Sequence, residues 1–209
     1  MAAAPLRFIT FEGGEGGGKS TQLRALAEAL RAAGEDVVTT REPGGAPGAE
    51  EIRRLLVEGE PGRWAPEAEA LLHFAARAEH LDKVIRPALK AGKWVLCDRF
   101  ADSTIAYQGY GQGVDRDWLQ QLRHRVVAAT EPGLTLVLDL PVETGLSRAL
   151  AQQRYERMGS AFHVRLRDGF RAIAREEPER CVVIDATRKI EAVAADVKAA
   201  VAQRYDVKL

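Results

Sequence analysis

The sequence predicts an α/β fold in which helices cover both faces of one parallel sheet. Five short runs rich in apolar residues alternate with helical patterns along the 209 residues. Neighbouring parallel strands need crossover connections of this kind, and strands covered on both faces are apolar throughout. A chain of this length forms one domain with a substantial core, so we expect a single domain over residues 1–209.

Five strands are expected at the apolar runs, which are residues 7–11, 36–40, 93–97, 134–140 and 180–184. Helical patterns separate them, near residues 19–33, 49–58, 66–90, 115–129, 142–152, 160–176 and 189–205. Gly34 and Gly92 follow two of these helices, where glycine adopts the left-handed conformation that commonly ends a helix. The last helix has one apolar face, formed by Ile190, Val193, Val197 and Val201.

The composition limits the partners and locations that we expect. Lysine and arginine together number 30, as do aspartate and glutamate, so the formal net charge is zero. This balance argues against a nucleic-acid or membrane partner bound by general electrostatic attraction. No apolar run approaches the roughly 20 residues of a membrane span, and residues 1–7 lack the apolar core of a signal peptide. We therefore expect a cytoplasmic protein in which Cys97 and Cys181 are buried thiols rather than a disulfide.

The first predicted strand leads into a glycine-rich turn and then a helix. The turn follows the pattern Gly13-x-x-x-x-Gly18-Lys19-Ser20, which binds phosphates in this strand–loop–helix context. Its N–H groups and the positive end of the helix dipole favour an anion. Lys19 is expected to reach the outer phosphates and Ser20 to ligate Mg²⁺. The alternative interpretation of this glycine-rich segment is a flexible linker. The expected phosphate-binding residues are Gly13, Gly14, Glu15, Gly16, Gly17, Gly18, Lys19, Ser20 and Thr21.

Polar residues follow the second and third predicted strands, at the edge of the sheet where ligands bind in such folds. Arg41 and Glu42 follow the second strand in a loop rich in proline and glycine, and we interpret them as substrate contacts. A surface ion pair is the alternative for these two residues. Asp98 follows the third strand and is typical of a second Mg²⁺ anchor, while Arg99 can bind a phosphate with two parallel hydrogen bonds.

The expected helix at residues 66–90 carries an apolar stripe that should face the core. The stripe consists of Leu71, Phe74, Ala78, Leu81 and Ile85. His73 and Arg77 lie on a neighbouring face and could share a pocket, although a solvated or core histidine is the alternative.

A polar segment rich in arginine, residues 148–157, follows the fourth predicted strand. It contains Arg148, Arg154 and Arg157. Such a segment can be a lid that brings cations to a phosphoryl group in transfer, and a solvated helix face is the alternative.

Several of these motifs together resemble the bacterial thymidylate kinases, which belong to the P-loop nucleoside monophosphate kinases. The motifs lie at residues 11–22, 40–45, 98–111 and 138–141, and they occur in the order of that family over about residues 6–205. The resemblance implies a P-loop kinase fold with a five-stranded parallel sheet and a short arginine-containing lid at about residues 148–160. It further implies a homodimer that transfers the γ-phosphate of ATP to dTMP with Mg²⁺.

The resemblance also implies roles for individual residues. Glu15 would meet the deoxyribose 3′-hydroxyl, Tyr107 would crowd the 2′ position, and Thr104 and Gln108 would lie near the thymine edge. The dTMP phosphate would be surrounded by Arg41, Arg53, Arg77 and Arg99. The full set of expected dTMP contacts is Glu15, Arg41, Glu42, Arg53, His73, Phe74, Arg77, Arg99, Ser103, Thr104, Tyr107 and Gln108. The metal would be held by Ser20 and Asp98, and the adenine side formed by Arg148, Asp185, Ala186 and Thr187.

One departure from the family pattern, and the choice between two layouts that occur in the family, bear on mechanism. Family members often carry a phenylalanine that stacks on thymine at the position of His73, so either His73 or the neighbouring Phe74 stacks here. The catalytic arginine of the family lies in the phosphate loop or in the lid, and residues 14–17 contain no basic residue. We therefore expect Arg154 in the lid to supply it, with Arg157 as the second candidate. The expected catalytic residues are Lys19, Asp98, Arg99 and Arg154.

Two other functions remain possible from the sequence. The first is a P-loop kinase for another nucleoside monophosphate or a deoxynucleoside, and the second is a P-loop switch that hydrolyses ATP or GTP as a signal. A switch would not need several arginines beside a second anion, which favours a kinase.

Overall fold

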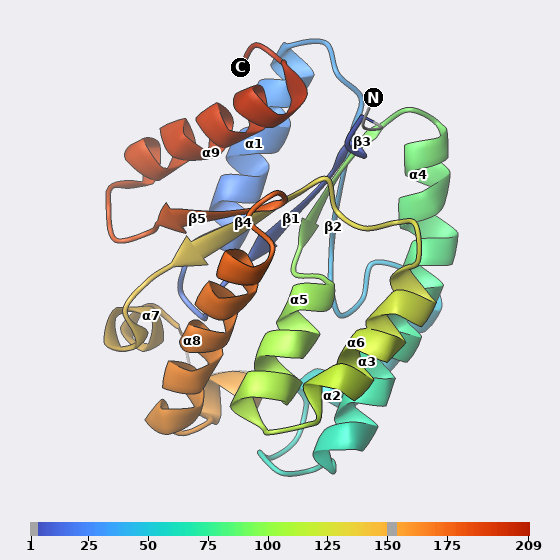
Figure 1. The fold of residues 1–209 in the computed structure, drawn as a ribbon, viewed down its shortest axis with the longest axis vertical. Coiled ribbons are helices and arrows are strands. Elements are labelled where there is room, and N and C mark those ends of the chain that lie inside the picture. The colour runs from blue at the N-terminus through green and yellow to red at the C-terminus, as the bar shows by residue number, and fades with distance from the viewer. Residues whose placement is uncertain (1–3, 150–153) are drawn as a thin grey trace.

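The structure is a computed structural model that describes residues 4–149 and 154–209. Its centre is a five-stranded parallel sheet with the order β2-β3-β1-β4-β5 (Figure 1). The strands are β1 (Phe8–Glu12), β2 (Val37–Arg41), β3 (Trp94–Asp98), β4 (Leu134–Asp139) and β5 (Cys181–Asp185). The predicted fold class is confirmed. Four strands begin and end one residue later than predicted, because the pairing continues onto polar end residues such as Asp98, which is in register with Phe11 and Arg41.

Helices cover both faces of the sheet (Figure 1). On one face α1 (Lys19–Ala32) and α9 (Ile190–Tyr205) lie side by side. Leu26, Leu30 and Val197 of these helices share a core cluster with the central strands. The other face is covered by α3 (Pro66–His80), α4 (Arg86–Lys90), α6 (Arg116–Val127) and α8 (Ser160–Glu176). The remaining α-helices of the described chain are α2 (Pro47–Val57), which packs on α3, α5 (Ala101–Thr104) and α7 (Val142–Arg148).

The predicted helix at residues 66–90 is interrupted by a π-helical turn. This turn, Leu81–Ile85, joins α3 to α4, and Pro87 is the second residue of α4. Proline has no N–H to donate, and a π turn changes the hydrogen-bond register ahead of it. Gly34 and Gly92 follow α1 and α4 with φ of 87° and 77°, as predicted.

Two predicted apolar faces are correct in part. In residues 66–90 the stripe is buried at Phe74, Leu81 and Ile85, but the prediction is wrong for Leu71 and Ala78, which are exposed. The buried face of α3 includes Arg77 and His80 instead, because both side chains contact the buried carboxylate of Glu42. In α9 the valines are buried as predicted, whereas Ile190 at the helix start is 59% exposed.

A helical segment that was not predicted follows β3. It comprises α5 and a π-helical stretch, Ile105–Gly111. Its glycines and β-branched residues disfavour a helix locally, so packing against α8 must stabilise it. A Cβ on Gly111 would lie 2.4 Å from the ring of Phe162, and one on Gly169 would lie 2.7 Å from Tyr110. These two glycines therefore allow the close approach of the helices.

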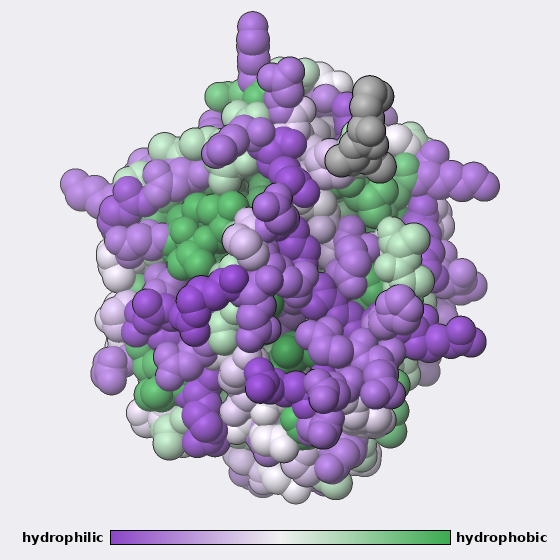
Figure 2. Space-filling model, viewed as in Figure 1, coloured by the Kyte–Doolittle hydropathy of each residue, from purple (hydrophilic) through white to green (hydrophobic). Residues whose placement is uncertain are grey.

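Cys97 and Cys181 are buried and free, as predicted. Within residues 4–149 and 154–209, no helix is long and apolar enough to cross a membrane. Figure 2 shows a largely hydrophilic face on which apolar side chains form small, separate patches.

Candidate active site

The candidate active site is a cavity of about 360 Å³ beyond the carboxyl ends of β1, β2 and β3. This volume suits a small organic ligand. The predicted residues that line it are Glu15, Gly16, Gly17, Gly18, Lys19, Ser20, Thr21, Arg41, Glu42, Arg53, His73, Arg77, Asp98, Arg99, Ser103, Thr104, Tyr107 and Gln108. Most of the motif residues, from segments far apart in the chain, therefore meet in one place.

The phosphate loop connects β1 to α1, and several of its positions have a backbone conformation that requires glycine. Gly13, Gly16 and Gly18 have φ of 125°, 66° and 81°. A Cβ on Gly16 would also lie 2.2 Å from the Gly145 carbonyl oxygen, inside van der Waals contact. Gly13 and Gly14 lie outside the main cavity and line a smaller pocket. The close contact with Gly145 thus fixes the loop, and residues 15–18 and the first residues of α1 line the cavity.

Lys19 begins α1 and is buried. Its Nζ donates hydrogen bonds to the carbonyl oxygens of Gly13, at 3.2 Å, and Gly14, at 2.6 Å. Burial, followed by repulsion from Arg99, lowers the pKa of Lys19 to about 8. A phosphate group beside Lys19 would favour the charged ammonium, because it would add to the negative charge of Glu15, Asp98 and Glu12, which already act to raise the pKa of Lys19.

Ser20 and Asp98 form the expected metal-binding pair. The Ser20 hydroxyl donates a hydrogen bond to Asp98 Oδ2 at 2.5 Å, and both residues line the cavity. The described residues contain no group of three or more His, Cys, Asp or Glu side chains that could hold a metal. Two protein oxygens fit Mg²⁺, which usually keeps several waters and binds substrate phosphates through its remaining positions.

Glu15, Arg99 and Tyr107 form a bonded group in the cavity wall. Arg99 Nη2 donates to Glu15 Oε1 at 3.0 Å, and the Tyr107 hydroxyl donates to the same oxygen. Burial would raise the pKa of Glu15, but the charges of Arg99 and Lys19 outweigh it and lower the pKa to about 2. Arg99 has a φ of 69°, an uncommon conformation for a side chain other than glycine that costs about 1–3 kcal/mol. The ion pair holds the guanidinium against the phosphate loop, where Nη1 also donates to the Gly13 carbonyl at 2.9 Å. These contacts offset the backbone strain.

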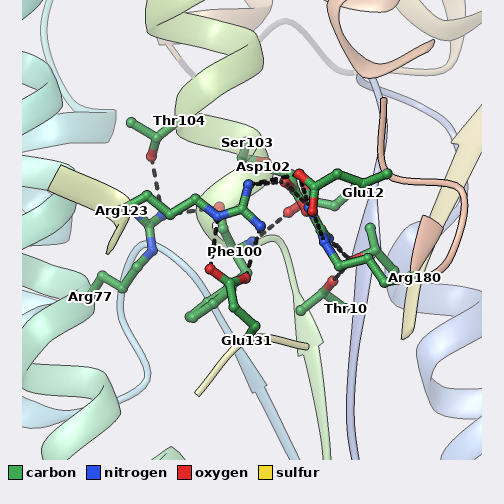
Figure 3. Close-up of polar contacts among 12 residues, drawn as sticks. Thr10, Glu12, Arg77, Phe100, Asp102, Ser103, Thr104, Arg123, Glu131 and Arg180 are labelled. Atoms are coloured by element: carbon green, nitrogen blue, oxygen red, sulfur yellow. Dashed lines mark hydrogen bonds and ion pairs between the residues drawn. The ribbon is translucent and has the colours of Figure 1, made fainter. Parts of the chain in front are cut away.

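A buried acid that the sequence analysis did not single out anchors the helix after β3. The carboxylate of Glu12 accepts hydrogen bonds from the Phe100 N–H at 2.8 Å and the Ser103 hydroxyl at 2.6 Å (Figure 3). Burial, and then repulsion by Asp102, raise the pKa of Glu12 to about 7. Since Glu12 directly precedes the phosphate loop, β1 holds that loop and the helix with the expected sugar and base contacts together.

Asp102 lies beside Glu12 in a network of buried arginines (Figure 3). Arg180 donates to both of its carboxylate oxygens at 2.7 Å, and Arg123 Nη1 lies 3.4 Å from Asp102 Oδ1. Burial would raise the pKa of Asp102, but Arg180 and Arg123 together lower it. This network ties α5 to β5 and α6, and it stabilises the back of the site without reaching the cavity lining.

Arg77 lies in the cavity wall rather than projecting from it. Its Nε donates to Glu42 Oε2 at 2.8 Å, and its Nη2 donates to the Phe100 carbonyl at 3.0 Å and to Thr104 Oγ1 at 3.1 Å. The guanidinium also packs on the ring of Phe74, 4.9 Å from the centroid. Nη1 is buried without a partner among the described residues, so the two N–H groups of this nitrogen remain for a ligand.

The structure separates the two rings that the sequence offered for stacking on a base. His73 lines the cavity, and its Nε2 is 2.9 Å from the Tyr155 hydroxyl. Burial, followed by repulsion from Arg77, lowers the pKa of His73 to about 3, so the imidazole is neutral. Phe74 is buried in a core cluster with α8 and does not line the cavity.

Arg154 is not in the cavity. Its side chain is fully buried, where Nη2 forms an ion pair with Glu69 and Nε donates to the Leu56 carbonyl at 3.0 Å. Arg157, the second candidate, pairs with Glu60 at 3.0 Å on the surface. The expectation that Arg154 supplies the catalytic cation is therefore at odds with this geometry, because a buried carboxylate holds its guanidinium away from the phosphates. The lid residues 150–153 lie outside the described part of the chain.

The residues expected on the adenine side also lie outside the cavity lining. Asp185 ends β5, and its Oδ1 accepts hydrogen bonds from the N–H and the hydroxyl of Thr187 at 3.0 and 2.7 Å. Ala186 is buried in the core cluster of α1 and α9. Arg148 ends α7, and its side chain is exposed. It lies beside the phosphate loop, because a Cβ added to Gly16 would be 3.0 Å from the Cβ of Arg148.

Five residues line the cavity although they were not predicted to do so, namely Pro43, Val57, Phe100, Tyr155 and Glu156. Pro43 and Phe100 lie inside the motifs at residues 40–45 and 98–111, so the motifs already pointed to them. Tyr155 packs edge-on against Tyr107 with ring centroids 5.3 Å apart. A single aromatic residue inside a polar, arginine-rich segment was the available signal for it.

Comparison with known proteins identifies the family of this chain. A family model described as thymidylate kinase matches residues 11–197. The chain belongs to the thymidylate kinase family. A thymidylate kinase from Caulobacter vibrioides is 57% identical over 200 residues, which cover 94% of this chain and 96% of that protein. One from Ruegeria pomeroyi is 56% identical over 194 residues, covering 91% and 92%.

The fold agrees with that of a solved thymidylate kinase. The crystal structure of thymidylate kinase from Ehrlichia chaffeensis is similar with a TM-score of 0.76 and 40% identity, over 93% of this chain and 97% of that one. The resemblance and the P-loop kinase fold predicted from the motifs are confirmed.

Proposed function

We infer that the protein transfers the γ-phosphate of ATP to dTMP, which yields dTDP and ADP. Membership of the thymidylate kinase family supports this reaction. The observation that carries it is one cavity lined both by a phosphate loop and by Arg41, Arg53 and Arg99. A site of this kind can hold two phosphate groups in contact, which phosphoryl transfer requires and a nucleotide switch does not.

The acceptor is already an anion, so the reaction needs no strong general base. Its main difficulty is the repulsion between the two nucleotides, and cations close to both phosphates lower that cost. Lys19 serves the donor phosphates, and Arg99, held between the phosphate loop and Glu15, bridges donor and acceptor. Arg41 and Arg53 hold the acceptor phosphate from the end of β2 and from α2.

The sugar and base of dTMP occupy the other end of the cavity. The Glu15–Tyr107 pair contacts the deoxyribose, and Tyr107 restricts the space for a 2′-hydroxyl. The neutral ring of His73 stacks on the base in place of the expected phenylalanine. Arg77 serves the base rather than the phosphate, because it donates to Thr104, one of the expected thymine contacts.

As a member of a kinase family, the protein uses ATP with a divalent metal. We propose that the metal is Mg²⁺ and that Ser20 and Asp98 hold it, directly or through water. When bound, the ion neutralises charge on the transferred phosphoryl group. The 2.5 Å contact between the two side chains supports their joint role.

We propose Arg148, rather than Arg154, as the cation that the lid adds to the donor phosphates. Arg148 is exposed beside Gly16 of the phosphate loop. Among the described residues no carboxylate pairs with it, so it can turn toward a phosphate without breaking a buried contact.

We further propose a homodimer that works in the cytoplasm, where its free nucleotide substrates occur, with no nucleic-acid partner. The outer surfaces of α2 and α3 carry exposed Leu55 and Leu71, with 39% and 48% of their surfaces accessible. Apolar side chains that are exposed on the outer surfaces of two neighbouring helices suit a contact with a second copy of the chain. Light scattering should give a dimer mass that Leu71→Glu reduces to a monomer mass.

An acceptor screen tests the proposed reaction. ADP formation should be measured with ATP, Mg²⁺ and, in turn, dTMP, dUMP, CMP and thymidine. We expect the highest kcat/KM with dTMP and negligible turnover without an acceptor. Equal rates for all four acceptors, or hydrolysis without any of them, would overturn the proposal and favour another kinase or a switch.

A further inference from the structure

The side-chain amide of Gln108 is held in one orientation. Gln108 is fully buried and lies in the cavity wall. Its Nε2 donates a hydrogen bond to Glu69 Oε1 at 2.8 Å, whereas its Oε1 has no partner among the described residues. A carboxylate can only accept hydrogen bonds, so the NH₂ group must face Glu69. The carbonyl oxygen is therefore the end of the amide that is left for a bound molecule.

Glu69 is itself fixed as an acceptor. It is fully buried and lies outside the cavity lining. Gln112 Nε2 donates to its Oε1 at 2.8 Å, and the Arg154 guanidinium forms an ion pair with its Oε2. Three donors from two segments of the chain thus converge on one carboxylate.

The cavity wall offers a second polar atom without a partner, Arg77 Nη1. The other nitrogens of this guanidinium are occupied by Glu42, the Phe100 carbonyl and Thr104. The wall therefore presents one fixed donor and one fixed acceptor. Thymine and uracil offer the complement, a ring carbonyl next to an imino N–H. Cytosine offers an amino group and an unprotonated ring nitrogen at the same two positions.

We propose that Glu69 is a positioning residue for base selection, which holds the Gln108 carbonyl toward the base so that only a pyrimidine with an imino N–H is satisfied. Cytosine in the same place would leave a buried carbonyl oxygen facing a ring nitrogen, and unpaired buried polar atoms are costly. The inference rests on the proposed function, because it takes dTMP as the acceptor.

The variant Glu69→Gln tests the proposal, because an amide can either accept from Gln108 or donate to it. Both orientations of the Gln108 amide then become possible. We expect the ratio of kcat/KM for dTMP to that for dCMP to fall roughly tenfold or more. The free-energy cost of a misplaced buried hydrogen bond corresponds to a factor of about this size. The ratio for dTMP to dUMP should stay unchanged, because both bases carry the imino N–H.

Two further variants separate selection from general damage. Gln112→Leu removes another donor to Glu69 without altering the cavity lining, so it should keep the dTMP-to-dCMP ratio. Gln108→Leu should lower the ratio, and adding Glu69→Gln to it should change the ratio no further if Glu69 acts through Gln108. An additional fall in the double variant would overturn the inference.

Equal losses with dTMP and dCMP in Glu69→Gln would show a merely structural role for Glu69, and an unchanged ratio would also overturn the proposal. If Glu69→Gln does not fold, because Arg154 is left unpaired, the double variant Glu69→Gln/Arg154→Met removes both charges and should show the same fall in the ratio. A wild-type protein that does not prefer dTMP to dCMP would instead overturn the proposed function, so the two failures are distinguishable.

Discussion

Replacing Arg154 with methionine should make the protein easier to unfold without removing its catalytic power. Both side chains of the Arg154–Glu69 pair have no exposed surface. Methionine keeps most of the length of the side chain and its contact with the Tyr155 ring, but it removes the positive charge. The carboxylate of Glu69 is then buried without its counter-ion, and breaking a buried pair in this way costs about 3–5 kcal/mol.

This magnitude is large enough for a clear measurement. A loss of about 3–5 kcal/mol in the free energy of unfolding corresponds to a fall in melting temperature of roughly 6–20 °C for a chain of this size. Urea-induced unfolding gives the free energy, and kcat should be measured at a temperature where both proteins are folded. Arg157→Met is the matched control. Arg157 pairs with Glu60, which is 81% exposed, so its loss should cost at most about 1 kcal/mol.

The opposite pattern would refute this reasoning. If Arg154→Met kept its stability within about 1 kcal/mol of the wild type and lost roughly 10²-fold in kcat, Arg154 would act on the transition state. A charge-neutral double variant with Glu69→Gln should recover part of the lost stability, because it removes the orphaned carboxylate.

Other predictions follow from the site. Since the pKa of Lys19 is lowered to about 8 and a phosphate favours its charged form, the Kd for ATP should be constant below pH 8 and weaken about tenfold per pH unit above it; calorimetry that shows no change up to pH 9 would contradict this. The pKa of Glu12 is raised to about 7 in the folded protein, so its contribution to stability is present below pH 4.5 and is lost between pH 4.5 and 7. Unfolding of the wild type should therefore become easier, relative to Glu12→Gln, between pH 5 and pH 8, and an unchanged difference would mean that Glu12 stays ionised. Gly16→Ala should abolish tight ATP binding because its Cβ meets a backbone carbonyl, whereas Gly14→Ala, with no atom within 4 Å of the added Cβ, should retain folding and measurable ATP binding. Arg148→Ala should lower kcat by roughly 10²-fold with stability unchanged, and activity within about threefold of the wild type would remove it as the lid cation.

The strands and most helices could be predicted because their signals are local. Apolar runs mark strands covered on both faces, and the periodicity of α1 and α8 marks amphipathic helices. The helical segment after β3 could not be predicted, because it depends on contacts made far away in the chain. Gly111 and Gly169 let the segment approach α8 closely, and no pattern within residues 101–111 reveals that partner.

The cavity residues could be predicted for a related reason. They follow the strands, and the carboxyl ends of parallel strands meet at one edge of the sheet. The residues that fix them in place could not be found in this way. Glu12 and Glu69 are single acids inside buried elements, and their hydrogen-bond partners lie 88 and 39 residues away in sequence. The role expected for Arg154 was at odds with the geometry for the same reason, since nothing near it in sequence indicates Glu69.

The cations of the cavity divide into two groups, and the division matches the proposed reaction. Arg41, Arg77 and Arg99 each form an ion pair with a carboxylate of the protein, so they are oriented before any nucleotide binds. Among the described residues the side chains of Lys19 and Arg53 donate hydrogen bonds only to backbone carbonyls, and burial lowers the pKa of both side chains. A phosphate therefore gains most by binding at these two, because it replaces no carboxylate there. In the proposed reaction Lys19 lies on the donor side and Arg53 on the acceptor side, so each nucleotide meets one cation that forms no ion pair among the described residues.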